Sequence, residues 1–174
     1  MRDPKLSHDL WSQAVTLLRP PISDLRGAIV LLEKAIASDD RNVPAFHLLA
    51  KLSLEAKAYD KVEEYCAQGA AVAETHPDLK ILPAQSGEPV HERQADGFNY
   101  FLFATALARG DPAKAQTLLE QLKAHWDKYD KGMYQVAWAA YEAHRSKLVP
   151  AKAGCAIVFL ALGGAIGISL AASL

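Results

Sequence analysis

The chain has 174 residues, 51% of them hydrophobic, and a formal net charge of −1. This length allows one domain of ordinary size with its own hydrophobic core. The near-neutral charge lacks the basic surplus of nucleic-acid-binding proteins, so we expect no nucleic-acid partner. Cys66 lies in a helical segment and Cys155 in a long apolar stretch, so we expect no disulfide, which is typical of a reducing compartment.

Three segments in the first half of the chain carry the periodicity of amphipathic helices. In residues 24–37 the apolar side chains recur at three- and four-residue steps, and residues 44–56 and 60–72 each build a similar apolar face. No segment alternates apolar and polar residues, and no Asn-Gly or Asp-Gly turn joins two strand-like runs. We therefore predict an all-α fold.

The spacing of small residues in these helices predicts a repeat. A set of small, medium and small side chains recurs after 34 residues: Ala28, Leu32 and Ala35, then Val62, Cys66 and Gly69. This period and pattern are typical of the second helix of a tetratricopeptide repeat, in which the small residues let paired helices approach closely. We therefore predict a tetratricopeptide-like stack of antiparallel helix pairs. The alternative is an ordinary pair of adjacent amphipathic helices.

A third helical pair is expected in residues 97–125. Its turn is well defined, because Gly110 can adopt the left-handed conformation, Asp111 can cap the next helix and Pro112 can begin it. Between the second and third pairs, residues 77–96 contain three prolines and one glycine, and we expect an inserted loop there.

Residues 132–148 predict one more helix, with aromatic residues on one face. Tyr134, Trp138 and Tyr141 follow one another at helical spacing. They either cap the helical stack or lie at a membrane interface. We favour capping, because Trp138 stands about 15 residues before the apolar stretch that ends the chain.

Residues 153–174 are 22 consecutive residues without a charge. A helix of that length rises about 33 Å, which is enough to cross a hydrocarbon core of about 30 Å. Basic residues precede the stretch and none follows it, and the N-terminal residues show no cleaved secretory signal. We therefore predict a helical domain in residues 1–149 and one C-terminal transmembrane anchor in residues 150–174, a tail-anchored arrangement. The alternative is a buried core helix.

Small residues form a stripe along this predicted anchor. Gly163, Gly167 and Ala171 follow one another at four-residue steps. Such stripes let transmembrane helices pack closely, so we expect these residues to contact another transmembrane helix. The alternative is a generally Gly- and Ala-rich anchor of moderate hydrophobicity, which would itself suit a mitochondrial membrane.

The sequence carries no motif for catalysis or for metal binding. The six histidines are scattered without His-x-x-x-His spacing, and no Cys-x-x-Cys occurs. Glycine-rich nucleotide-binding motifs and the Gly-x-Ser-x-Gly motif of hydrolases are also absent from the sequence. We therefore expect no catalytic residue, no cofactor and no metal site, and we expect that the protein is not an enzyme.

Residues 24–32, residues 43–65 with Ala58-Tyr59-Asp60-Lys61 at the start of the second helix, and residues 74–77 together resemble the mitochondrial fission-adaptor family. Members carry a small tetratricopeptide-like bundle on a C-terminal anchor rich in Gly and Ala. The resemblance implies anchoring in the outer mitochondrial or a peroxisomal membrane, with a concave groove that recruits soluble partners. By position it places four partner-binding residues on the inner face: Phe46, Leu49, Leu52 and Tyr59.

The chain departs from this family in two ways. The segments 77–96 and 97–125 are additional, and no short basic tail follows the anchor. We therefore keep two functional hypotheses. The first is a non-enzymatic scaffold that binds other proteins at an organelle membrane, expected to be mitochondrial. The alternative is an accessory subunit of a larger mitochondrial membrane complex, such as a respiratory-chain assembly, with the anchor packed against other transmembrane helices.

Overall fold

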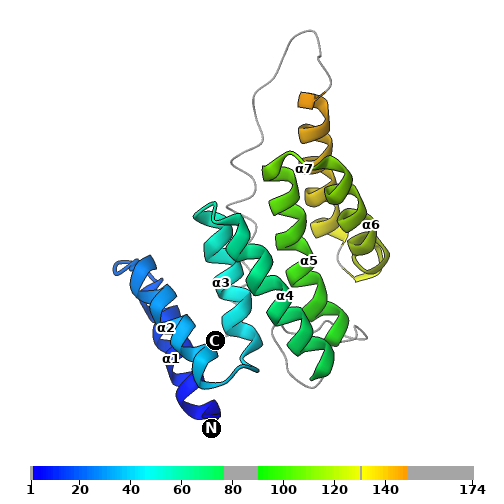
Figure 1. Ribbon diagram of the computed structural model, residues 1–174. Helices are drawn as coiled ribbons and strands as arrows, with labels where there is room; N and C mark the ends of the chain where they lie inside the picture. Colours follow the sequence, from blue (N-terminus) through cyan, green and yellow to red (C-terminus); the bar gives the residue numbers. More distant parts are fainter. Residues whose placement is uncertain (1, 77–89, 130, 149–174) are drawn as a thin grey trace.

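A computed structural model describes residues 2–76, 90–129 and 131–148 (Figure 1). Within these residues the chain forms seven helices and no strand, so the predicted all-α fold is confirmed for the described part. In chain order the helices are α1 (Pro4–Leu17), α2 (Leu25–Ser38), α3 (Val43–Glu55), α4 (Tyr59–Thr75), α5 (Val90–Arg109), α6 (Pro112–Tyr129) and α7 (Lys131–Leu148).

The helices pack as successive hairpins. Helix α1 lies against α2, α3 against α4, and α5 against α6, and α7 packs on the outer side of α6 (Figure 1). Neighbouring hairpins meet where α2 contacts α3 and α4 contacts α5, and the first helices of the second and third hairpins, α3 and α5, also touch. The result is an elongated stack in which each helix packs mainly against its neighbours along the chain.

Side-chain caps fix the starts of several helices. The Asp24 carboxylate accepts a hydrogen bond from the Gly27 N–H at 2.8 Å at the start of α2. At the start of α6 the Asp111 carboxylate accepts from the Lys114 N–H at 3.0 Å. The preceding Gly110 has φ of +74°, and α6 begins at Pro112. The turn between α5 and α6 is therefore formed as predicted.

Helix α1 was not predicted, and its buried face explains why. Ser7 occupies a fully buried position where an amphipathic pattern needs an apolar residue. Its hydroxyl donates to the Ala35 carbonyl at 2.7 Å and accepts from the Asn42 amide at 2.8 Å. The same Asn42 caps α3 through the Ala45 N–H. This buried polar network joins α1, α2 and the start of α3, and its hydrogen bonds offset the cost of burying the Ser7 hydroxyl.

Part of the predicted 77–96 loop is helical. Helix α5 begins at Val90, so residues 90–96 belong to it, while residues 77–89 lie outside the described residues. These first helical residues are mostly polar, and apolar periodicity alone therefore did not reveal them. Pro89 immediately precedes the helix, at an end where proline is readily accommodated.

The repeated small residues lie where the helices approach one another most closely. All six members of the two predicted sets are buried. At Gly69 of α4, an added Cβ would lie 2.7 Å from Phe98 Cε1 on α5 and 2.9 Å from Phe46 Cβ on α3. Gly69 therefore accommodates two aromatic side chains from two different hairpins. The spacing predicted close contact only between the two helices of one pair.

No helix of the described residues is long and apolar enough to cross a membrane. The predicted anchor, residues 150–174, lies outside the described residues.

The contact at Gly69 predicts a large effect of substitution. Gly69→Leu should lower the free energy of unfolding by about 2–4 kcal/mol, because the new side chain must displace Phe98 or Phe46. This loss should appear even though leucine has a helix propensity about 0.8 kcal/mol better than glycine. Chemical denaturation of the full chain in mild detergent, followed by circular dichroism, measures this loss.

Ala67→Leu, at an exposed position of the same helix, is the matched control and should change stability little. Equal effects of the two substitutions would contradict the close packing at Gly69.

Candidate interaction surface

Three of the four residues predicted to bind a partner lie in the core. Phe46, Leu49 and Leu52 of α3 are each no more than 3% exposed. Side chains this buried contact a partner only if the helices separate, so the structure assigns them to core packing instead of a binding face. Tyr59 is partly exposed at the start of α4, where the Arg109 guanidinium lies 5.7 Å from its ring centre.

The least buried stripe of α3 carries His47 and Lys51, one helical turn apart. The His47 ring lies 4.8 Å from the Phe101 ring and 5.8 Å from the Phe98 ring, centre to centre, so the imidazole is enclosed by aromatic side chains of α5. This burial, together with the smaller effect of the nearby Lys51 ammonium, lowers the pKa of His47 to about 4. His47 is therefore neutral at physiological pH and serves as part of the α3–α5 interface.

An ionic cluster connects α4 to the turn between α5 and α6. The Glu63 carboxylate lies 3.0 Å from Arg109 Nη1 and 2.7 Å from Lys114 Nζ, and Arg109 also pairs with Asp60. The hydrogen bond from the Lys114 ammonium holds the pKa of Glu63 below its usual value. The cluster is partly exposed, so its contribution to stability is about 1 kcal/mol or less. Its charges compensate one another, and it fixes the second hairpin against the third.

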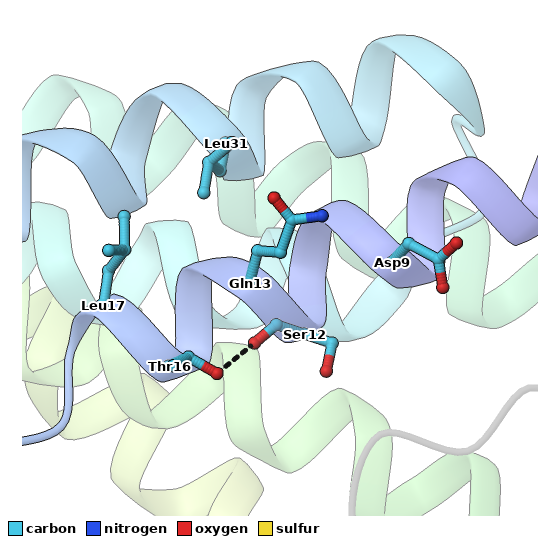
Figure 2. Close-up of a pocket in the computed structure, with 6 residues that line it drawn as sticks. All are labelled: Asp9, Ser12, Gln13, Thr16, Leu17 and Leu31. Atoms are coloured by element: carbon cyan, nitrogen blue, oxygen red, sulfur yellow. Dashed lines mark hydrogen bonds between the residues drawn. The ribbon is translucent and has the colours of Figure 1, made fainter.

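An open depression lies on the first hairpin, at the surface shared by α1 and α2 (Figure 2). It has a volume of about 510 Å³, and its lining residues are Asp9, Ser12, Gln13, Thr16, Leu17 and Leu31. Figure 2 shows the four polar side chains along one side of α1, with the leucines supplied by the end of α1 and by α2. The lining thus combines polar side chains of α1 with two leucines, and protein-binding surfaces contain both kinds of group.

The depression could not be found from the sequence, because α1 itself was not predicted. One local signal was present: Asp3 accepts a hydrogen bond from the Leu6 N–H at 2.9 Å, and Pro4 follows it as the first helical residue. An acidic cap followed by proline is a recognised start of a helix. The sequence gives no indication that the polar side chains of α1 line a surface together with α2. That becomes clear only when the two helices are seen side by side.

Among the described residues, no group of three or more His, Cys, Asp or Glu side chains is arranged to hold a metal ion. Cys66 is fully buried, and burial raises the pKa of its thiol to about 12. Its Sγ lies 3.7 Å from the Phe98 carbonyl oxygen, consistent with a weak hydrogen bond from the thiol. This cysteine is therefore a small core residue and not a nucleophile at neutral pH.

Comparison with protein-family models, with curated proteins and with solved structures finds no match to this chain. The resemblance to the fission-adaptor family therefore stays a prediction. The predicted packing residues of the anchor, Gly163, Gly167 and Ala171, lie outside the described residues.

The environment of His47 predicts a pH-dependent stability. Its pKa is about 4 in the folded chain and near 6.5 when unfolded, so between these values the unfolded state binds a proton that the folded state does not. The stabilising effect of the neutral ring is therefore complete above pH 6.5 and falls as the pH drops toward 4. The loss should be on the order of 2 kcal/mol, allowing for the partial exposure of the ring.

Denaturation curves of the wild type and of His47→Phe at several pH values measure this contribution as their difference. The carboxylates titrate in both proteins and cancel. His8→Gln, at an exposed position of α1, is the control and should keep the wild-type pH dependence. A wild-type curve parallel to that of His47→Phe between pH 4 and 6.5 would disprove the assignment.

Proposed function

We propose that this chain is a membrane-anchored scaffold of tetratricopeptide-like architecture that binds other proteins and has no catalytic activity of its own. The observation that carries the proposal is the stack of helical hairpins with buried small residues repeated after 34 positions. Stacks in which each unit contacts only its neighbours present extended surfaces, and proteins built in this way commonly use them to bind other proteins.

The depression on α1 and α2 is the surface we assign to partner binding. It is open, it lies on the first hairpin of the stack, and Leu17 and Leu31 supply apolar contact area beside the polar side chains of α1. Exposed polar groups such as those of Asp9 and Gln13 give direction to a bound peptide or helix through hydrogen bonds.

The anchor is proposed from sequence. Residues 153–174 are long enough and sufficiently apolar to cross a bilayer, and basic residues precede them. We assign the membrane to the mitochondrion, because a Gly- and Ala-rich anchor of moderate hydrophobicity suits that organelle. The scaffold would then hold its partner at the membrane surface.

Partner capture tests the scaffold. Affinity purification of the full chain in mild detergent, followed by mass spectrometry, should recover a protein that Gln13→Arg combined with Thr16→Arg no longer retains. The two arginines place bulk and charge across the depression without changing a buried side chain. Ala37→Arg, at an exposed position of α2 that does not line the depression, is the matched control and should retain the partner. Retention by the double variant would rule out this surface.

The alternative is an accessory subunit of a larger mitochondrial membrane complex. The observation that favours it is the stripe of Gly163, Gly167 and Ala171, which would let the anchor pack against other transmembrane helices. In that case the anchor, as well as the helical domain, makes a specific protein contact.

Native gel electrophoresis distinguishes the two functions. If the chain is a subunit, Gly163→Leu with Gly167→Leu should release it from a comigrating complex, because the larger side chains keep the helices apart. If it is a scaffold with a lipid-facing anchor, the double variant should migrate like the wild type. Ile166→Leu is the conservative control at a neighbouring position of the same segment. Unchanged migration of the glycine variant would eliminate the subunit hypothesis.

A further inference from the structure

Two of the aromatic residues of α7 predicted to share one role, Tyr141 and Trp138, lie in different environments, and the side chain of the third, Tyr134, lies outside the described part. Tyr141 is 4% exposed, and its hydroxyl donates to Gln116 Oε1 of α6 at 3.1 Å. Ala137 and Ala140 are buried as well, so this side of α7 faces the stack. Trp138 is 45% exposed, although its ring centre lies only 6.0 Å from that of Tyr141. Capping of the stack therefore accounts for Tyr141 and leaves the exposure of Trp138 to be explained.

Trp138 shares its side of α7 with a basic residue. Arg145 follows it two helical turns later and is exposed. Glu142 lies 3.7 Å from Arg145 and compensates one charge, whereas Lys147 and Lys152 follow in the sequence and no acidic residue follows Glu142. An exposed indole ring beside a local excess of positive charge is the combination that favours the interface of an anionic bilayer.

The chain length beyond α7 keeps this helix close to the proposed anchor. Helix α7 ends at Leu148, and only residues 149–152 separate it from the uncharged segment. Even fully extended, that connection spans about 17 Å. If residues 153–174 cross a bilayer, the C-terminal end of α7 must therefore lie within this distance of the hydrocarbon core.

The direction of α7 relative to the membrane is limited in the same way. A straight continuation of α7 into the anchor would place Trp138 about 22 Å from the first apolar residue, in water. Pro150 follows the end of α7 in the sequence and disfavours a straight continuation of the helix, because proline lacks the N–H and clashes with the preceding turn. The chain can therefore turn here, and α7 can lie along the membrane surface.

We propose that the side of α7 carrying Trp138 and Arg145 lies on the anionic phospholipid surface of the membrane, with the indole at the level of the headgroups. The proposal rests on the membrane anchoring proposed above. It adds a second membrane contact, made by the folded domain itself, that fixes the stack's orientation on the bilayer.

Tryptophan fluorescence tests this contact. The full chain with Trp11→Phe and Trp126→Phe keeps Trp138 as its single tryptophan. It is reconstituted into vesicles of phosphatidylcholine and phosphatidylglycerol that contain lipids brominated close to the headgroup. Emission from Trp138 should shift to shorter wavelength and be quenched several-fold more strongly than in the control.

The control moves the tryptophan to the other end of the stack. Val30 of α2 is 44% exposed, nearly the same as Trp138, so Val30→Trp in a chain with Trp11, Trp126 and Trp138 replaced by Phe reports a site of equal exposure away from α7. Its emission should remain unquenched. Arg145→Glu in the Trp138 chain should reduce the quenching, because it replaces an attraction to anionic lipid by a repulsion.

Alkaline extraction of the same vesicles separates this inference from the proposed anchoring. A chain that resists extraction, with Trp138 unquenched, overturns the contact of α7 and leaves the anchor standing. A chain removed by extraction overturns the anchor, and the contact of α7 with it. Equal quenching at position 30 and at Trp138 also overturns the proposal, because it would mean general adsorption of the domain. Circular dichroism confirms that each variant is folded.

Discussion

The packing of Gly69 against two phenylalanines is the constraint on which the arrangement of the stack depends. Phe46 comes from the helix paired with α4, and Phe98 comes from the first helix of the next hairpin. The Phe98 ring and the Phe46 Cβ both reach the same point of α4 only because that point lacks a side chain. Gly69 therefore determines how closely α4 packs against α3 and against α5. The same close packing brings the His47 ring into contact with the Phe98 and Phe101 rings.

The first hairpin is joined to the stack by different means. Here Ser7 and Asn42 form a buried polar network, and the end of α2 supplies a backbone carbonyl as its acceptor. Such a network is directional, because each donor must meet its own acceptor at hydrogen-bond distance. The second and third hairpins, in contrast, are held by close apolar packing and by the exposed ionic cluster at Glu63. One stack therefore uses two kinds of interface.

The features that were predicted correctly from the sequence are those that depend on interactions between neighbouring residues. The Gly110-Asp111-Pro112 turn formed in each detail, since its cap, its positive φ and its helix start involve only neighbouring residues. Helix α1 was missed because its buried Ser7 is satisfied by residues far along the chain. Phe46, Leu49 and Leu52, expected on the inner face, are buried in the core, because periodicity identifies an apolar side but not how many neighbouring helices cover α3. The same limit applies to Trp138 and Tyr141, which lie close together on α7 while only one of them faces α6.

The serial arrangement of the helices has a mechanical consequence. Within the described residues each hairpin packs mainly against the next, so a force applied between the first hairpin and α7 passes mostly through the interfaces in turn. The force at which such a molecule starts to unfold is the force that its weakest interface between hairpins can bear. A stack of this kind therefore extends first at its least stable interface. At the joint between the first and second hairpins, the hydrogen bond from the Asn42 amide to the Ser7 hydroxyl tolerates only a small extension before it breaks.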